Sequence, residues 1–426
     1  MSGTASIAER APWLANPALQ KLLAVLSQNG EEARIAGGAV RNALLGDPVA
    51  DVDIATTNLP DETIRCASAA GFKTVPTGIE HGTITVIVEG SAYEVTTLRD
   101  DVETDGRHAV VHFGRDWKRD AERRDFTINA LYVEADGTVI DLVGGLADIE
   151  ARRLRFIGDA EKRIREDYLR ILRFFRFFAW YGSGRPDADG LKACARLKDG
   201  LERLSAERVW SELKKLLGAP DPSRALLWMR QSGVLSKILP ESEKWGIDAI
   251  HPLVSTEKEL GWTADPLLRL EAIVPPDAPR MKSLAERLRL STRESDRLVN
   301  WAAEAQTAAD TSDLALRKRL YFGEPEGVAD RLRLSLASAH AKAVSDDAAL
   351  KDAAGFSRQL KIAEAWKKPE LPVKGNDLIA LGLETGPQLG KALRSLEEVW
   401  ADSGFVLNRQ ALLEKAKALP AIQERP

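Results

Sequence analysis

The sequence predicts an α+β protein in which a small mixed-sheet domain is followed by a long all-helical portion. Segments typical of strands, short and rich in β-branched residues, occur only in the first third of the chain. Beyond residue 150 the sequence consists of amphipathic stretches rich in Leu, Ala, Arg and Glu. At 426 residues the chain is long enough for about three domains of roughly 150 residues each.

The expected strands all lie before residue 150, and almost everything beyond it is expected to be helical. Alternating or β-branched runs predict strands at residues 33–35, 51–55, 82–89, 92–98, 127–133 and 139–142. Clusters of glycine and proline then interrupt the helical pattern at residues 182–186, 218–222, 275–276 and 368–369. The turns at 219–220 and 275–276 are the candidate domain boundaries. We expect a sheet domain over residues 1–150, a helical segment over 151–220 and a helical remainder over 221–426.

The composition is ordinary for a globular protein, with 44% hydrophobic and 29% charged residues. No run of about 18 apolar residues is present, and the N-terminal residues lack the pattern of a signal peptide. These features predict a cytoplasmic protein without a membrane partner. Cys66 and Cys194 are far apart and lack Cys-x-x-Cys neighbours, so we expect reduced, partly buried thiols and no structural zinc.

The charge pattern leaves two interpretations open for residues 151–176. The net charge of −4 argues against a protein that coats nucleic acid indiscriminately. Residues 151–176 nevertheless contain nine Lys or Arg and four Asp or Glu. This excess suits phosphate groups, but a solvated helix face would show the same pattern.

A double glycine, Gly37 and Gly38, precedes two carboxylates, Asp51 and Asp53. Alternate side chains of a strand point to one face, so we expect Asp51 and Asp53 side by side, with Val52 and Ile54 facing the core.

Two carboxylates at this spacing can hold Mg²⁺, which bridges nucleotide phosphates. Glycine backbone ahead of the helix predicted over residues 39–45 can approach a triphosphate closely. The pattern therefore predicts nucleotidyl transfer. A lone Asp-x-Asp is common on surface turns, and the preceding Gly-Gly-x-x-Arg, which contains Arg41, makes the metal interpretation the stronger one.

A second motif, Arg-Arg-Asp-Phe-Thr-Ile-Asn-Ala-Leu, spans residues 123–131. Its arginines, Arg124 among them, can neutralise a triphosphate. Asp125 can orient these arginines or serve as a third carboxylate facing the metal. Glu94, in the expected strand over residues 92–98, is the alternative third carboxylate, and the sequence does not choose between them.

A third motif, Glu-Asp-Tyr-Leu-Arg, begins at Glu166, and we expect it to lie on one continuous helix. Arg163, Asp167 and Arg170 would then share a face beside an apolar stripe of Tyr168, Ile171, Leu172, Phe175 and Phe178. A carboxylate only accepts and a guanidinium only donates, so Asp167 with Arg170 can pair with adenine or cytosine and mismatches guanine or uracil. An ordinary ion pair on a helix surface is the alternative.

Together these motifs resemble the class II CCA-adding tRNA nucleotidyltransferase and bacterial poly(A) polymerase family, within the polymerase beta superfamily. The resemblance rests on residues 37–41, 51–53, 77–83, 123–131 and 166–173. It is dense from residue 35 to about 180 and loose beyond. It implies a nucleotidyltransferase head followed by an all-helical neck, body and tail, with CTP and ATP as substrates and an RNA 3′ end as acceptor.

The resemblance also implies the site residues. Mg²⁺ is expected on Asp51 and Asp53, with Asp167 and Arg170 serving as a protein template for the incoming base. Nucleotide contacts are expected from Gly37, Gly38, Arg41, Arg124, Asn129, Asp167, Arg170, Arg173 and Arg176. Asn42 departs from the family, which often carries Asp there, and we expect the exchange to be tolerated because Arg41 is retained.

Three functions remain possible: CCA addition to tRNA, poly(A) tailing, and RNA binding without catalysis. Every carboxylate and arginine that the chemistry needs is present, which argues against a non-catalytic relative. Residues 77–83 resemble the CCA-adding branch, whereas poly(A) polymerases of this family usually have an arginine-rich segment there. Residues 105–113 resemble the flexible loop that the family uses when it changes from C to A addition. No protein partner is implied.

The segment from Lys374 to Gly390 predicts a helix, a glycine turn and a second helix that begins near Pro387. The backbone donors around Gly386 can bind a phosphate of the tRNA, with Lys374 and Lys391 adding positive charge. A purely structural hairpin is the alternative.

Overall fold

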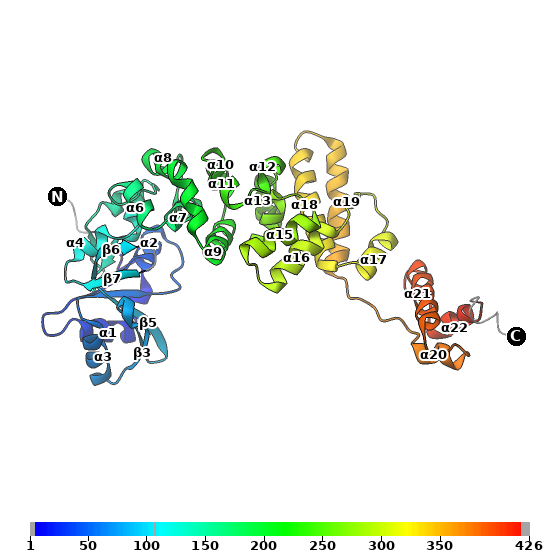
Figure 1. The fold of residues 1–426 in the computed structure, drawn as a ribbon, viewed down its shortest axis with the longest axis horizontal. Helices are drawn as coiled ribbons and strands as arrows, with labels where there is room; N and C mark the ends of the chain where they lie inside the picture. The colour runs from blue at the N-terminus through cyan, green and yellow to red at the C-terminus, as the bar shows by residue number, and fades with distance from the viewer. Residues whose placement is uncertain (1–4, 106–107, 419–426) are drawn as a thin grey trace. The chain divides into compact units, whose positions relative to one another are not determined.

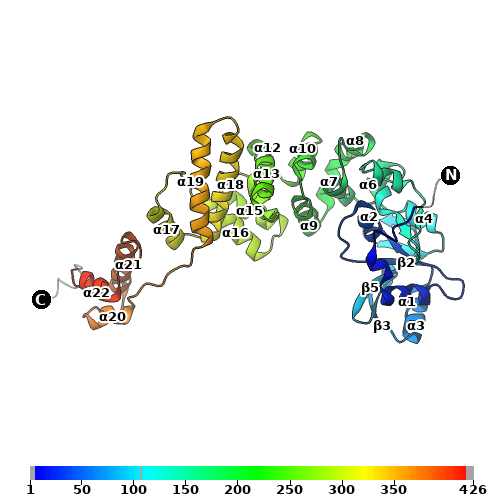
Figure 2. The ribbon, with the colours of Figure 1, turned by 180° about the vertical axis from the view of Figure 1, so that it is seen from behind.

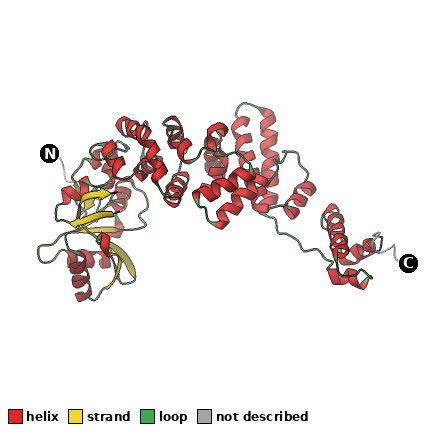
Figure 3. Cartoon of the chain, in the orientation of Figure 1, coloured by secondary structure: helices red, strands yellow, loops and turns green. Residues whose placement is uncertain are grey.

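The computed structural model describes residues 5–105 and 108–418. The chain divides into two compact units, residues 1–240 and 241–426. The described strands all belong to the first unit, and the second is helical (Figures 1 and 3). The expected α+β class, with a small mixed sheet followed by helices, is confirmed. None of the helices in the described ranges combines the length and apolar character that crossing a bilayer requires.

The first unit is built on a seven-stranded sheet with the order β3-β4-β5-β2-β1-β8-β9. Its strands are β1 (Ala33–Ala36), β2 (Asp53–Thr56), β3 (Lys73–Gly78), β4 (Thr83–Val88), β5 (Ser91–Thr97), β8 (Leu131–Val133) and β9 (Val139–Asp141). Neighbouring strands are antiparallel except β2 and β5, which are parallel and pair Asp53 with Glu94. A separate two-stranded ribbon joins β6 (Arg99–Asp105) and β7 (His108–Phe113).

Helices of the first unit pack on the seven-stranded sheet. The helices of this domain are α1 (Pro17–Leu26), α2 (Gly38–Leu45), α3 (Pro60–Ala69), α4 (Trp117–Glu122) and α5 (Gly145–Glu150), with 3₁₀ turns η1 (Pro12–Ala15), η2 (Ile79–His81) and η3 (Thr127–Asn129). α1 and α3 pack against each other and against β4 (Figure 2). α2 packs on β1 and β8, which brings the glycine turn beside the start of β2.

A helical extension completes the first unit. It consists of α6 (Ala160–Glu166), α7 (Leu169–Tyr181), α8 (Ala188–Leu197), η4 (Lys198–Arg203), α9 (Ala206–Leu217), α10 (Ser223–Gln231) and α11 (Val234–Ile238). α7 joins it to the sheet domain through phenylalanine rings: Phe174 stacks on Phe156 at 5.4 Å between centroids, and Phe126 lies 4.8 Å from Phe156. These rings are buried, so α7 has a fixed position relative to residues 123–131.

The second unit contains two helical groups. The first comprises α12 (Ser242–Trp245), α13 (Ile250–Leu260), α14 (Pro266–Ile273), α15 (Ala278–Leu288), α16 (Thr292–Ala303), α17 (Asp313–Phe322), α18 (Pro325–Ala343) and α19 (Asp347–Glu364). The second comprises α20 (Gly375–Ala380), α21 (Pro387–Asp402) and α22 (Arg409–Lys417), which share buried Leu378, Leu396 and Leu412. The helix, glycine turn and helix expected after Lys374 are confirmed.

Several expected elements are wrong in detail. β3, β6 and β7 were not expected, because Pro76 and the charges of residues 99–105 conceal the pattern. β3 tolerates Pro76 because it is an edge strand. The expected strand 127–133 is instead η3 followed by β8. Of the loop over residues 105–113, Gly106 and Arg107 lie outside the described residues.

The expected boundaries at 219–220 and 275–276 lie inside the two units and not between them. Ala219 is buried and α10 packs on α7, so the first turn belongs to the core of unit 1. A proline-rich turn therefore marks a change of helix direction here. The three-part division of the chain remains a prediction.

Candidate nucleotide-transfer site

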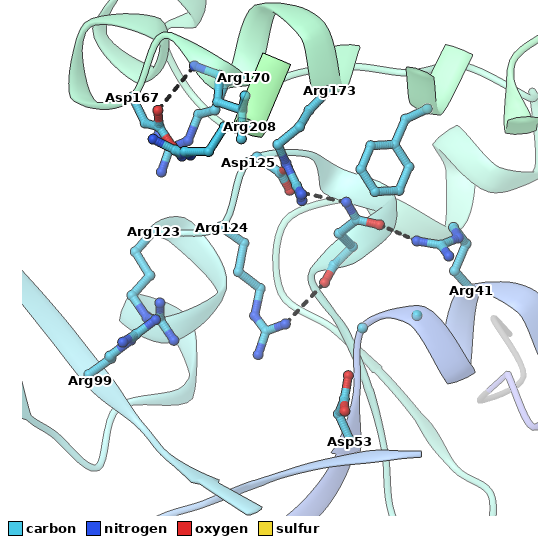
Figure 4. A pocket seen from close by; sticks show the side chains of 15 residues that line it. Arg41, Asp53, Arg99, Arg123, Arg124, Asp125, Asp167, Arg170, Arg173 and Arg208 are labelled. Carbon is cyan, nitrogen blue, oxygen red and sulfur yellow. Dashed lines mark hydrogen bonds and ion pairs between the residues drawn. The ribbon is translucent and has the colours of Figure 1, made fainter. Parts of the chain in front are cut away.

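A polar cavity of about 570 Å³ lies in the first unit between the sheet domain and α7 (Figure 4). Within the described ranges, its lining contains seven arginines and three aspartates. The lining residues are Gly37, Gly38, Arg41, Asp53, Arg99, Arg123, Arg124, Asp125, Asn129, Asp167, Leu169, Arg170, Arg173, Phe177 and Arg208. This excess of guanidinium groups suits a polyanion such as a triphosphate.

The glycine turn at the cavity requires glycine at its first position. Gly37 has φ +67° and precedes the first turn of α2, where it accepts the N–H of Arg41. A Cβ at Gly37 would come within 3.3 Å of an Arg124 guanidinium nitrogen. Glycine therefore permits both the left-handed backbone and the close approach of Arg124.

The carboxylate edge differs from the expected arrangement. β2 begins at Asp53, so Asp51 lies before the strand and the two do not share a strand face. Ile54 is buried as expected, whereas Val52 is only half-buried. Asp53 pairs instead with Glu94 on the parallel strand β5. Partial desolvation raises the pKa of Asp53, and the negative charges of Glu94 and Asp51 raise it further.

The three acidic side chains at this edge are therefore close enough to repel one another. Such repulsion favours a bound cation. Within the described residues, no group of three or more His, Cys, Asp or Glu is arranged to hold a metal ion by itself. Carboxylate oxygens open to solvent fit Mg²⁺ chemically, provided that water or substrate supplies the remaining ligands.

Asp125 is occupied by other contacts. It forms an ion pair of 2.6 Å with Arg173 and accepts hydrogen bonds from the Asn129 amide, at 3.0 Å, and from the Phe126 N–H. Burial alone would raise the pKa of Asp125, but Arg173 and Asn129 hold it below its usual value. Asp125 thus lies in a satisfied network, and Glu94 is the carboxylate that lies beside Asp53.

The network continues to Arg41. The Arg41 guanidinium donates to the Asn129 side chain at 2.5 Å and to the Tyr181 hydroxyl at 2.9 Å. It also donates to the Asn42 side-chain oxygen at 2.9 Å. The exchange at position 42 therefore preserves an acceptor for Arg41. Burial lowers the pKa of Arg41.

A second buried carboxylate, Asp120, orients the motif arginines. It accepts hydrogen bonds from Arg123 at 2.5 Å, from Arg124 at 3.1 Å and from the Tyr132 hydroxyl at 2.6 Å. Burial alone would raise the pKa of Asp120, but the two arginines hold it below its usual value. Asp120 thus fixes two cations at the cavity wall, a role that we did not expect from the sequence.

The pair expected to select the base, Asp167 and Arg170, is not on one continuous helix, because the helix breaks at Asp167. α6 ends at Glu166, Asp167 has extended backbone (φ −153°, ψ 109°), and α7 begins at Leu169. The Asp167 side chain accepts the Leu169 N–H at 3.0 Å, a local bond that competes with helix continuation. Asp167 and Arg170 both line the cavity, although their side chains bond to other partners.

Two expected features are not supported. Arg176 does not line the cavity, and it pairs with Glu212 at 2.6 Å. Most of the cations in residues 151–176 are likewise paired with carboxylates, as in Arg155–Asp148 at 3.0 Å. This segment is therefore largely an ion-paired helix surface, and two of its arginines, Arg170 and Arg173, also line the cavity.

The remaining expected residues lie outside the cavity lining. Asp51 and Glu94 are exposed and lie outside the cavity lining. Lys374 and Lys391 are exposed on the second unit. Cys66 is half-buried and Cys194 is buried, both as free thiols, as expected.

The sequence did not reveal Arg99, Phe177 and Arg208 as lining residues. Phe177 belongs to the apolar face of α7, and Arg208 belongs to α9, about 40 residues after the motif that it joins. No local pattern marks either one.

Known proteins share this architecture over nearly the whole chain. A mitochondrial CCA tRNA nucleotidyltransferase 1 of Mus musculus is 34% identical over 415 residues, covering 94% of this chain and 89% of that protein. The chain belongs to the CCA-adding tRNA nucleotidyltransferase family. A CCA-adding enzyme of Streptococcus pneumoniae is 33% identical and covers 92% of this chain and 96% of the bacterial protein.

Family models and solved structures agree with membership of the CCA-adding family. A poly A polymerase head domain matches residues 33–155, and a probable RNA- and SrmB-binding site of polymerase A matches residues 186–245. The crystal structure of the Bacillus stearothermophilus CCA-adding enzyme in complex with CTP has a TM-score of 0.71 at 28% identity. The structural match covers 94% of this chain and 97% of the Bacillus stearothermophilus chain. The resemblance inferred from the motifs is confirmed.

Proposed function

We propose that this protein adds or repairs the 3′-terminal CCA of tRNA, using CTP and ATP without a nucleic-acid template. The observation that carries the proposal is one cavity that joins motif arginines, the Asp53 edge and the Asp167–Arg170 pair. A triphosphate, its reacting phosphate and its base each meet suitable chemistry there. Relatives named as CCA-adding enzymes support this function over poly(A) tailing.

We propose that Asp51 and Asp53 hold Mg²⁺, with Glu94 as the nearby third carboxylate. When bound, the metal would stabilise negative charge on the reacting phosphate. Arg123 and Arg124, fixed by Asp120, bind the triphosphate and compensate its charge. Asn129, through Arg41 and Asp125, holds the wall of the cavity in place. Arg173 acts on the nucleotide through the same network.

Asp167 and Arg170 select the base. An ionised carboxylate accepts the amino group of adenine or cytosine, while the guanidinium donates to the neighbouring ring nitrogen. The carbonyl and N–H of uracil or guanine face the wrong partners. Selection therefore requires no nucleic-acid template.

A cytoplasmic location also remains a prediction.

The decisive experiment uses a tRNA transcript that ends before its CCA, supplied with each nucleoside triphosphate alone and with CTP and ATP together, followed by sequencing of the product. We expect two C residues from CTP, CCA from the mixture and no extension by UTP or GTP. Long A tails on unrelated RNA would instead establish a poly(A) polymerase. RNA binding without incorporation would establish a non-catalytic relative.

Asp167→Ala is expected to lower the preference for CTP over UTP by about tenfold or more, because a hydrogen-bonding partner of the base is lost. The unfolding temperature should change little, since Asp167 makes only partly exposed contacts. Competition assays with labelled CTP and UTP measure the preference. An unchanged preference with a lowered unfolding temperature would refute the selecting role.

Lys391→Glu is expected to weaken tRNA binding and to reduce its salt dependence by about one unit of the log–log slope, because one phosphate contact is lost. Lys391 is exposed on α21, and Gly386, with φ +154°, precedes that helix. Nucleotide addition to a short acceptor hairpin serves as the control and should be unaffected. Equal loss on both substrates, or on neither, would refute the contact that we propose for Lys374 and Lys391.

A further inference from the structure

A second cavity, of about 480 Å³, lies within the second unit. Its lining comes mainly from α12, α13, α14, α16 and α18, and α18 packs against α13, α14 and α16 (Figure 1). Trp245, Leu334 and Ala337 contribute apolar surface to this lining. Trp245 is exposed, so the cavity is open to solvent there. A cavity of this size falls within the range of pockets that hold small organic molecules.

The wall of this cavity contains a buried carboxyl group that lacks a hydrogen-bond partner. Glu271, on α14, is 1% exposed, and neither of its side-chain oxygens is hydrogen-bonded to any of the described residues. The positive charge of Arg297 acts on Glu271, but its guanidinium pairs with Asp265 at 2.6 Å and with Asp330 at 2.8 Å. A buried polar group without a partner destabilises the folded chain. Stability therefore does not explain the position of Glu271.

A second unpaired polar group lines the same cavity. The side-chain N–H of Trp301, on α16, is buried and has no hydrogen-bond partner in the described part of the chain. Arg331, from α18, lies over the indole ring at 5.0 Å from its centroid and donates to the Trp301 carbonyl at 3.0 Å. Arg331 thus holds the indole in place while the indole N–H remains available. Two unpaired polar groups from different helices therefore belong to one cavity.

The charges of the cavity indicate which ligand chemistry it suits. Burial and the negative charge of Asp330 raise the pKa of Glu271, which favours the neutral acid. A neutral carboxyl group donates through its O–H and accepts through its carbonyl oxygen. Arg331 and Lys342 in the lining outnumber the other lining carboxylate, Asp248, and this excess opposes a cationic ligand. The cavity therefore suits an uncharged group that donates and accepts side by side, as a primary carboxamide does.

We propose that this cavity is a binding site for a small, uncharged aromatic molecule that carries a carboxamide or an equivalent donor–acceptor pair. The Glu271 carboxyl group forms two hydrogen bonds with this pair, and the Trp301 N–H donates to the second acceptor position of the amide oxygen. The apolar lining, with Trp245 and Leu334, covers the aromatic part. The site uses none of the groups assigned to nucleotide transfer and goes beyond the proposed function.

The first test compares naphthalene carboxamide with analogues of similar shape, by calorimetric titration of the wild-type full-length chain. Naphthyl methyl ketone lacks the N–H donor, naphthoate is an anion and naphthylmethylammonium is a cation. We expect the carboxamide to bind at least about tenfold more tightly than each analogue, because the analogues leave a buried polar group unpaired. Equal binding of the carboxamide and the ketone, or no binding of any of these compounds, would overturn the proposal.

The second test removes the carboxyl group with Glu271→Met, which keeps an unbranched side chain of similar length. Its affinity for naphthalene carboxamide should fall about tenfold, to that of the ketone. The unfolding temperature should equal or exceed that of the wild type, because a buried unpaired group is removed. A merely structural Glu271 would leave the preference for the carboxamide unchanged, which would contradict the assignment.

Glu326→Gln is the matched control. The negative charge of Glu326 also acts on Glu271, but Glu326 is exposed and does not line the cavity. This variant should bind naphthalene carboxamide as tightly as the wild type. An equal loss of affinity in Glu326→Gln and Glu271→Met would show a general effect of charge and would count against a direct contact with Glu271.

Competition distinguishes this cavity from the sites of nucleotide transfer. Neither excess CTP nor excess tRNA lacking its CCA should displace naphthalene carboxamide. Displacement by CTP would place the compound in the nucleotide cavity, and displacement by tRNA would assign the second cavity to RNA. Either result would overturn the proposal. Nucleotide incorporation by the wild type tests the proposed function separately, so the two can fail independently.

Discussion

Asp53→Asn is expected to reduce nucleotide incorporation in Mg²⁺ by at least about 10³-fold, because the loss of a metal ligand removes charge stabilisation from the transition state. The fold should be retained. Burial and the negative charges of Glu94 and Asp51 raise the pKa of Asp53, so its ionised form destabilises the folded state at neutral pH. The unfolding temperature of the variant should therefore equal or exceed that of the wild type. Single-turnover incorporation and thermal unfolding measure the two effects.

Metal removal provides a second measurement on the same variant. Mg²⁺ that binds only the folded chain should raise the unfolding temperature of the wild type, and EDTA should reverse the increase. Asp53→Asn should show a smaller increase. The matched control is Asp61→Asn, since Asp61 is an exposed aspartate in the first turn of α3, away from the cavity. More than a tenth of wild-type incorporation in Asp53→Asn would contradict the metal assignment.

Asp125→Asn is expected to lower the free energy of unfolding by about 3 kcal/mol, because the substitution leaves the largely buried Arg173 guanidinium without its carboxylate. Incorporation should also fall, since Asn129 and Arg41 belong to the same network. Urea denaturation followed by circular dichroism measures the change in stability. The double variant Asp125→Asn/Arg173→Met removes the unpaired charge, and it should regain at least about 1 kcal/mol over Asp125→Asn.

The pH dependence gives an independent check. Arg173 and Asn129 hold the pKa of Asp125 below its usual value, so the Asp125 carboxylate stabilises the folded state at pH values above the unfolded pKa of about 3.9. This contribution is lost as the pH falls through the folded pKa. The stability difference between wild type and Asp125→Asn should thus be constant from pH 7 to about pH 5 and shrink below about pH 4. A pH-independent difference, with equal stability of the single and double variants, would contradict the ion-pair explanation.

Two features of the site could be read from local sequence. Gly37 precedes a helix and lies at a positive φ that glycine adopts without strain. The order of the five motif segments identified the family, and the arginines of residues 123–131 do line the cavity. These features depend on local backbone conformation and on neighbours within a few residues. Both can be inferred directly from the amino-acid sequence.

Other features depend on which distant segments meet. The sequence left Glu94 and Asp125 as equal candidates for the third carboxylate. The parallel pairing of β2 with β5 brings Glu94 beside Asp53. The packing of α7 places Arg173 where it forms an ion pair with Asp125. Strand register across some 40 residues is a property of the whole sheet, because every side chain changes face when a strand shifts by one residue.

The sequence by itself determined the α+β class and the family, and it named the side chains that we propose for the chemistry. The tertiary structure decided how those side chains are held. Asp167 appeared to continue a helix, yet its carboxylate binds the Leu169 N–H and Arg208 from α9, and the helix breaks there. Apolar periodicity reports which face of a helix is buried, whereas hydrogen bonds between helices depend on packing between segments far apart in the chain. That is why the motif residues could be named from the sequence and their partners, Arg208 and Asp120, could not.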